Sequence, residues 1–375
     1  MVQRVENRFI GKIIILIKFF NVMFAALLLA LIFYLGASKA LHSFWHSENL
    51  IIDSGETFSI SPGSSRNQVI GQLVGRGVLE SRSLTKLAIR YYEPNLVLKA
   101  GEYRLPDSPS RAQLFALLAS GVSVQYPVTI VEGFTAIEAY SALAQQSVNS
   151  RDLHRPLSAA LIEGQLRDVL SDAARDMMGG NDASEGWFFP DTYHVVKVGA
   201  TIDVFRRAHQ NMVEVLQAEW DLRQADLPYA GPYEALIMAS LIEKETGAIE
   251  EREAIAGVFV RRLQKRMRLQ TDPSVIYGLG SDFKGNLTRE HLRRDTLYNT
   301  YSRHGLPPTP IALPGREAIR AALHPAAGET LYFVAKGDGS HHFSVTYKEH
   351  QRAVQQYQIL NRRSNYQSAP KVGPG

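Results

Sequence analysis

Two glutamates near the end of one predicted helix are the residues best suited to acid–base chemistry. The apolar spacing predicts a helix over Tyr233–Thr246, and residues three, four and seven apart share one of its faces. Glu245 continues the apolar face, whereas Glu243 lies roughly opposite. A carboxyl group among apolar side chains is costly to ionise, which raises its pKa and lets it donate a proton near neutral pH. Glu245 therefore has the properties of a general acid.

A structural role for Glu245 is the alternative. The carboxylate could lie at the exposed end of the helix, or it could pair with Lys244, Arg252 or Arg261. Because structural carboxylates outnumber catalytic ones, the helical pattern alone slightly favours this second interpretation. The neighbouring segments must therefore decide between the two.

Three further segments combine aromatic rings with amides and carboxylates. Leu269–Tyr277 crowds polar groups ahead of an apolar run, and its Asp-Pro pair signals the start of a helix. Tyr298–Tyr301 and Glu185–Tyr193 add aromatic, amide and acidic side chains. Sugar polymers present apolar faces for stacking and polar groups for hydrogen bonds, so this mixture suits a glycan. Taken singly, each segment is also typical of core packing, a helix cap or a turn.

The sequence lacks the motifs of several common enzyme classes. It contains no GxSxG, Walker A, HExxH or dinucleotide-binding glycine pattern. His341, His342 and His350 form a cluster, but adjacent residues on a strand point to opposite faces, so a structural or hydrogen-bonding role is favoured over a metal site. The chain has no cysteine, which excludes disulfides, thiolate chemistry and iron–sulfur clusters. We therefore expect neither a metal nor a cofactor.

The elements that must position these residues form an α+β domain over residues 127–362. Several helices alternate with a few separated strands, a pattern typical of that class. Asp338-Gly339 is a hairpin turn signal between the predicted strands Leu331–Ala335 and Phe343–Thr346. The other predicted elements are a strand over 127–131 and helices over 135–145, 201–220, 252–265 and 347–361. Residues 363–375 are expected to be a tail.

A smaller α/β module is predicted over residues 51–126. Its expected elements are strands over 58–60 and 101–105 and helices over 66–75, 84–92 and 111–119. The module contains no convincing catalytic group. Binding, spacing or a merely structural role is therefore expected of it.

The N-terminal region predicts a membrane anchor. Phe19–Ser38 is twenty residues long without a charge, which suits a single helix across a bilayer. A cleaved signal peptide is the alternative, but its apolar region is usually shorter. Basic residues precede the span, so residues 1–18 should stay in the cytoplasm and everything after residue 38 should face outward. Residues 39–50, with Trp45, are expected to be an interfacial collar and linker.

Composition narrows the functional classes. With 375 residues, 45% hydrophobic and 21% charged, the chain fits about two folded domains and excludes a disordered, collagen-like or polytopic membrane protein. A net charge of +4 without a long basic run argues against dedicated nucleic-acid binding.

Five segments together resemble the membrane-anchored endolytic murein transglycosylases, the YceG-like or MltG family. They are EGWFFPDTY (185–193), ASLIEKET (239–246), RRLQKRMRLQTDPSVIYGLG (261–280), YNTYSRHGLPPTPIALPG (298–315) and ALHPAAGETLYFVAKGDGSHHFSVTYKEH (322–350). The resemblance implies a LysM-like module near the membrane and a catalytic domain after it. It also implies lyase cleavage within peptidoglycan strands, and the family's catalytic glutamate matches Glu245.

This resemblance also implies how one glutamate suffices. In lytic cleavage the C6 hydroxyl of N-acetylmuramic acid attacks its own C1 and leaves a 1,6-anhydro end, so no second carboxylate is strictly required. Resemblance and chemistry together make further residues candidates to hold the glycan or orient the acid: Gln270, Asp272, Tyr298, Asn299, Tyr301, Glu185, Asp191 and His341.

The expected location is the inner membrane, with the C-terminal domain in the periplasm. Peptidoglycan strands and the membrane are the expected partners, peptidoglycan synthases are candidate neighbours, and control of nascent strand length is the expected role. Two alternatives stay open: a non-catalytic glycan-binding scaffold of the cell-wall machinery, and a hydrolytic muramidase that uses Glu245 with Asp191 or Asp272.

Overall fold

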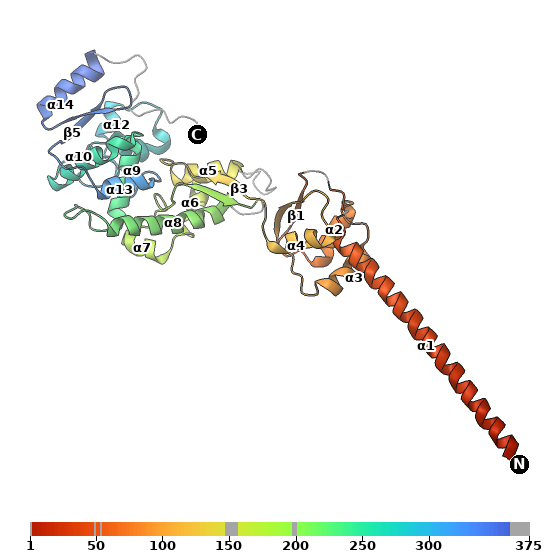
Figure 1. Cartoon of the computed structure of the whole chain (residues 1–375). Helices are drawn as coiled ribbons and strands as arrows, with labels where there is room; N and C mark the ends of the chain where they lie inside the picture. Colours follow the sequence, from red (N-terminus) through yellow and green to blue (C-terminus); the bar gives the residue numbers. More distant parts are fainter. Residues whose placement is uncertain (1, 49, 53–54, 147–156, 197–200, 361–375) are drawn as a thin grey trace. The chain divides into compact units, whose positions relative to one another are not determined.

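The computed structural model describes residues 2–48, 50–52, 55–146, 157–196 and 201–360 (Figure 1). The chain forms two compact units, one of Met1–Gln125 with Val196–Val198 and the other of Tyr126–Val195 with Gly199–Gly375. The tail predicted over residues 363–375 lies outside the described residues.

The first unit begins with one long helix, α1 (Val2–His46), drawn in red in Figure 1. Its segment Lys18–His46 contains an 18-residue window with a mean hydropathy of 2.3 and is long and apolar enough to cross a membrane. The apolar window of this segment is not buried within the protein, unlike the core helix of a soluble domain. Length and composition are therefore consistent with a single-pass anchor.

A small βααβ arrangement follows the long helix. Strands β1 (Thr57–Ile60) and β2 (Gly101–Arg104) pair antiparallel, with Phe58 opposite Tyr103. Helices α2 (Arg66–Gly75) and α3 (Arg82–Tyr92) connect them, and α4 (Arg111–Ser120) follows. Capping boxes at Ser65 and Ser110 fix the starts of α2 and α4 by satisfying otherwise free backbone groups. The LysM-like character of this unit stays a prediction from the resemblance.

The predicted linker over residues 39–50 is wrong, because α1 continues into the core of the module. Trp45 is 1% exposed and stacks on the rings of Phe115 and Tyr92 at centroid distances of 5.6 and 6.1 Å. Arg111 donates a hydrogen bond to the carbonyl oxygen of Phe44 at 3.0 Å. The aromatic residues near the end of α1, which suit a membrane interface in sequence, are thus used for core packing. The anchor helix and the module belong to the same compact unit.

The second unit is α+β, as predicted, and its strands form small sheets. Strand β3 (Tyr126–Thr129) pairs antiparallel with β4 (Thr192–Val195), and β5 (Tyr332–Ala335) forms a hairpin with β6 (His341–Ser344). The predicted turn is present, but β6 begins two residues earlier than Phe343. The described α-helices are α5 (Ala136–Gln146), α6 (Ala159–Arg167), α7 (Asp172–Met178), α8 (Thr201–Asp221), α9 (Pro232–Glu245), α10 (Arg252–Gln264), α11 (Asp272–Leu279), α12 (Arg289–Arg293), α13 (Arg316–Leu323) and α14 (Tyr347–Val354). Two short 3-10 helices, η1 (Ile249–Glu251) and η2 (Gly280–Asp282), and one π-helix, η3 (Gln355–Leu360), complete the unit's described helices.

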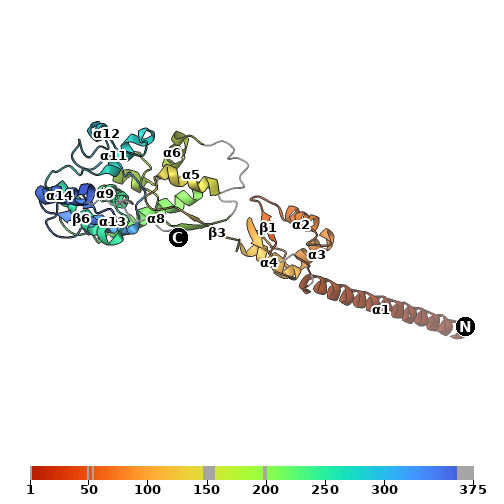
Figure 2. The same cartoon turned by 90° about the horizontal axis from the view of Figure 1, so that it is seen from above.

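Helix α9 is the centre of this unit. Every residue from 235 to 242 is buried, and the helix packs on α13, α10, α8 and α11. Figures 1 and 2 both show α14 at one end of the unit and α5 with β3 at the other. The helix ends at Glu245 because Thr246 takes an extended conformation, with φ −143° and ψ 139°. A rigid, buried helix therefore delivers Glu245 to its place.

Candidate active site

Glu245 is the last residue of α9, and one hydroxyl group holds its carboxyl group. Thr271 donates a hydrogen bond from Oγ1 to Glu245 Oε2 at 2.7 Å. Thr271 is 1% exposed, and its own backbone N–H donates to Thr300 Oγ1 at 3.0 Å. Because the donor is itself fixed, the carboxyl group of Glu245 has a defined orientation.

Burial, with a smaller contribution from the nearby charge of Asp272, raises the pKa of Glu245 to about 7. The hydrogen bond from Thr271 and the positive charge of Arg262 act in the opposite direction. The balance leaves the group able both to donate and to accept a proton near neutral pH. This is the property required of a general acid that later acts as a base.

Glu243 has a different environment, as the helical phase predicts. Its Oε1 accepts a hydrogen bond from Arg252 at 2.9 Å, and both side chains of this ion pair are 6% exposed. Its Oε2 accepts the backbone N–H of Gly315 at 3.0 Å. The arginine that could have neutralised Glu245 is thus paired with Glu243. Glu243 joins α9 to α10 and to the start of α13, which is a structural role.

Two cavities meet at Glu245. The polar cavity has a volume of about 410 Å³ and the apolar cavity about 870 Å³, and Glu245 and Asp272 line both. Both volumes lie in the range of small-ligand sites in proteins, roughly 300–1,000 Å³. A ligand bound at Glu245 can therefore extend to either side of it.

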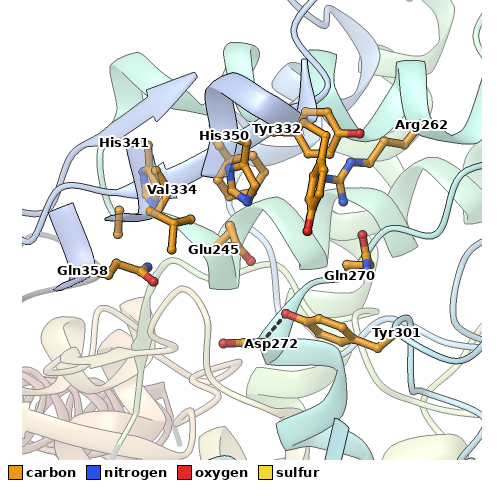
Figure 3. A pocket seen from close by; sticks show the side chains of 14 residues that line it. Glu245, Arg262, Gln270, Asp272, Tyr301, Tyr332, Val334, His341, His350 and Gln358 are labelled. Carbon is orange, nitrogen blue, oxygen red and sulfur yellow. Dashed lines mark hydrogen bonds between the residues drawn. The ribbon is translucent and has the colours of Figure 1, made fainter. Parts of the chain in front are cut away.

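The polar cavity is framed by the β5–β6 hairpin, α14 and the loop before α11. Figure 3 shows Glu245 between His341, His350 and Tyr332 on one side and Asp272 with Tyr301 on the other. Arg262 reaches its wall and donates hydrogen bonds to the carbonyl oxygens of Leu331 and Leu269 at 2.7 and 2.6 Å. Both of these acceptors are neutral. Among the described residues no carboxylate pairs with the Arg262 guanidinium within 4 Å.

The histidines of the polar cavity are held in place by other side chains. Glu251 Oε2 lies 2.7 Å from His341 Nδ1, and its Oε1 accepts the backbone N–H of His341 at 2.9 Å. A carboxylate only accepts, so His341 Nδ1 carries the hydrogen. His350 stacks on Tyr332 at 5.2 Å, and burial lowers its pKa, with Arg262 adding to the effect. Its ring is therefore neutral near pH 7.

The apolar cavity is lined by Ile137, Pro273, Ile276 and Phe283, with Glu185 at its wall. Glu185 is 6% exposed; its Oε1 accepts the backbone N–H of Ala136 at 2.9 Å, and its Oε2 accepts from the hydroxyl of Tyr277 at 3.3 Å. Burial raises the pKa of Glu185 to about 8 in spite of these bonds. Glu185 is therefore mostly protonated at pH 7 and able to donate a hydrogen bond.

The structure brings most of the predicted site residues together. Gln270, Asp272, Tyr301 and His341 line the polar cavity, and Glu185 and Asp272 line the apolar one. Tyr301 donates a hydrogen bond to Asp272 at 2.6 Å, which fixes the second carboxylate of the site. The roles assigned to these residues stay predictions.

Three of the predicted residues do not line either cavity. Asn299 is 1% exposed and donates to the carbonyl oxygens of His291, Leu292 and Arg294, so its amide organises a loop. Tyr298 packs edge-on against Tyr277 at 4.9 Å and bonds Thr309. Asp191 lies at the start of β4, where it accepts the N–H of Thr192. The wall position expected for Asp191 is not observed.

Sequence reasoning missed Thr271, Arg262 and Glu251. Thr271 stands beside Gln270 and Asp272, but nothing in the local pattern shows that its hydroxyl faces another helix. Arg262 and Glu251 lie on segments whose charged residues look solvated in sequence. Within the described residues no group of three or more potential ligands is placed to hold a metal ion.

Comparison with known proteins identifies the family of this arrangement. The family model of the YceG-like family matches residues 58–356, most of the chain. The chain belongs to the YceG-like family. One relative is the endolytic murein transglycosylase of Bacillus subtilis, 31% identical over 316 residues, which are 81% of this chain and 86% of that protein. The match therefore includes both the module and the unit that carries Glu245.

Two further proteins are similar over about the same share of the chain. The endolytic murein transglycosylase of Streptococcus pneumoniae D39 is 28% identical over 328 residues, 79% of this chain but 57% of that longer protein. The crystal structure of a yceG-like protein from Listeria monocytogenes matches 80% of this chain and 100% of its own, with 28% identity and a TM-score of 0.49.

Proposed function

We propose that the protein is an endolytic murein transglycosylase that uses Glu245 as both general acid and general base. The observation that carries the proposal is the position of Glu245 at the junction of two cavities, fixed by Thr271 and with a pKa near 7. A group between two cavities suits cleavage within a strand, because sugar units can occupy both sides of the bond. The names of the relatives describe the same activity.

In the proposed reaction Glu245 first donates a proton to the substrate and later accepts one from it. Protonated Glu245 gives its proton to the glycosidic oxygen, and the bond between C1 of N-acetylmuramic acid and that oxygen breaks. The C6 hydroxyl of the same sugar attacks C1, the O6–C1 bond forms, and the hydroxyl proton passes to Glu245. The products are a 1,6-anhydro end and a new 4-hydroxyl end. Glu245 returns to its starting state without water being consumed.

Asp272 is suited to stabilise the positive charge that develops at C1. It lines both cavities with Glu245, and the hydrogen bond from Tyr301 holds its carboxyl group in place. An anion beside an oxocarbenium-like transition state lowers its free energy. Gln270 and His341, also in the polar cavity, are proposed to hold the glycan through hydrogen bonds.

A hydrolytic muramidase is the second candidate, because Asp272 is a carboxylate beside the proposed acid. In that reaction Asp272 would activate a water molecule or form a covalent intermediate. Asp191 is less suited to this role, since it lines neither cavity. A non-catalytic scaffold would need the aromatic and amide side chains but not a carboxyl group titrating near pH 7.

Mass analysis of products distinguishes the three functions. The purified full-length protein is incubated with isolated peptidoglycan, and the soluble muropeptides are examined. Anhydro ends, each lighter by one water than a reducing end, support the proposal. Reducing ends support the muramidase, and intact strands support the scaffold. The Glu245→Gln variant is the control for contaminating activity.

The surroundings of the reaction are part of the same proposal. We infer that α1 anchors the protein in the inner membrane and that the residues after the span lie on the periplasmic side, because basic residues precede the span. An enzyme tethered there would meet strands as they are made and limit their length. Synthases of peptidoglycan would then be its neighbours.

A further inference from the structure

Helix α3 of the first unit carries an apolar stripe that no described residue covers. Leu84, Leu87 and Tyr91 are 47%, 53% and 58% exposed. Their spacing of three and four residues places them on one face of the helix. The core of the module is packed by a different face, that of Thr85, Ala88 and Ile89, which are buried.

The rest of the exposed surface of α3 is basic. Arg82, Lys86 and Arg90 are all exposed, and no acidic residue occurs in the helix. At 100° per residue Arg82 and Lys86 lie on the side away from Leu84 and Tyr91, and Arg90 borders the stripe next to Leu87. An exposed apolar face beside a row of lysine and arginine is the composition of a helix that lies in a membrane interface.

The position of α3 relative to the anchor supports this interpretation. α3 packs on α1 within one compact unit, and both views of the molecule show α3 beside the C-terminal end of α1 (Figures 1 and 2). The hydroxyl of Tyr91 interacts with the hydroxyls of Tyr34 and Ser38 on α1. These two residues are at the end of the uncharged stretch 19–38. When α1 crosses a bilayer, Tyr91 is therefore at the level of the bilayer surface.

We propose that α3 is a membrane-interface helix that rests on the same bilayer that α1 crosses. Leu84, Leu87 and Tyr91 enter the boundary between headgroups and acyl chains, where aromatic rings with a hydroxyl group are favoured. Lys86 and Arg90 extend past the stripe to anionic lipid phosphates. The proposal is independent of the enzymatic activity and requires only that α1 spans the membrane.

The consequence is that the module has a fixed height and orientation on the membrane. α1 enters the module as an unbroken helix, and Trp45 at its end is buried in the core. A second contact through α3 removes the remaining freedom to tilt about the membrane surface.

Spin labelling of the full-length protein tests the proposal, because the chain contains no cysteine that would have to be removed. Single cysteines replace Leu84, Leu87 or Tyr91, and the labelled protein is placed in nanodiscs of phosphatidylethanolamine and phosphatidylglycerol. Collision with oxygen, which concentrates in lipid, is compared with collision with a water-soluble nickel chelate. We expect the three labels to be accessible to oxygen and protected from nickel.

Two control positions show how a label behaves on a surface that faces water. Arg82 is exposed on the same helix on the side opposite the stripe, and Leu161 on α6 is the same residue type as Leu87 with 59% exposure. Labels at both positions should be accessible to nickel. If the label at position 87 is as accessible to nickel as that at 161, the proposal is wrong. Spin–spin broadening that disappears on dilution with unlabelled protein would instead show that a second copy covers the stripe, and would overturn it too.

Discussion

Replacing Thr271 by valine should move the pH dependence of cleavage upward. Valine keeps the shape of the buried threonine and the backbone bond to Thr300, but it cannot donate a hydrogen bond to Glu245. That bond stabilises the charged carboxylate and lowers its pKa, so its loss raises the pKa. Protonated Glu245 starts the reaction, and the variant should therefore stay active at more alkaline pH than the wild type.

The size of this change follows from the strength of one hydrogen bond to a charged group. Such a bond contributes about 1.5–3 kcal/mol, and one pH unit corresponds to about 1.4 kcal/mol, so the pKa of Glu245 should rise by roughly 1–2 pH units from about 7. Above pH 7, the activity of the variant relative to the wild type should grow by up to about tenfold per pH unit until the new pKa is reached. At lower pH the variant should be slower, because its acid is weaker and less well oriented.

The assay is the initial rate of anhydro-muropeptide release from isolated peptidoglycan, followed over roughly pH 5–10. Thr246→Val is the matched control. Thr246 is also 1% exposed and adjacent to Glu245, but its hydroxyl accepts a hydrogen bond from the backbone of Ala248 at 3.0 Å. The control should leave the pH position of the profile unchanged. A Thr271→Val profile that does not move, or that moves to lower pH, would refute the role given to Glu245.

Four further outcomes are expected. Glu245→Gln should fold normally and lose about 10²–10⁴-fold in cleavage rate. Glu243→Gln should keep turnover per folded molecule but lose about 3 kcal/mol of unfolding free energy, because the buried Arg252 keeps only the longer ion pair with Glu132 at 3.7 Å. If rate and melting assays instead showed that Glu243→Gln loses activity and Glu245→Gln loses stability, the roles given to Glu243 and Glu245 would have to be exchanged. The folded protein keeps a proton on Glu185 that the unfolded chain releases, so the free energy of unfolding should fall by a few kcal/mol as pH rises from about 4.5 to 8. In chemical denaturation at several pH values, Glu185→Gln should make this fall smaller. If the wild type and the variant lose stability equally with pH, Glu185 is not protonated in the fold. A reporter fused after residue 375 should work only if it tolerates the periplasm, and normal activity of a cytoplasm-only reporter would reverse the proposed orientation.

The local sequence pattern was enough to predict elements with regular apolar spacing or with clear start and stop residues. Helix α2 has the predicted bounds, α9 begins and ends one residue earlier than predicted, and α10 ends one residue earlier. Strand β4 was not predicted, because its short run of alternating residues is a weak signal and the strand forms by pairing with β3. Trp45 shows the same limit, since a tryptophan near a membrane and a tryptophan in a core look alike in sequence.

From local pattern alone, the direction of a site residue could be predicted only where its own helix determines it. Helical phase separated Glu245 from Glu243 correctly, because both are on the rigid α9. Asn299 was misjudged because an amide suited to hold a sugar is equally suited to hold three backbone carbonyl groups, and only the folded loop decides. Thr271 and Arg262 reach the site from other segments of the chain, a convergence that no local pattern contains.

The meeting of two unlike cavities at one carboxyl group makes this protein a candidate for inhibitors assembled from two fragments. One fragment would carry an anionic or amide group for Arg262 and His341, and the other an apolar ring for Ile276 and Phe283. When two ligands are joined by a short linker, binding of the first presents the second at an effective concentration in the millimolar range. The linker would have to pass Glu245, where a basic atom could pair with its carboxylate. Such a molecule would gain affinity from geometry that neither cavity has alone.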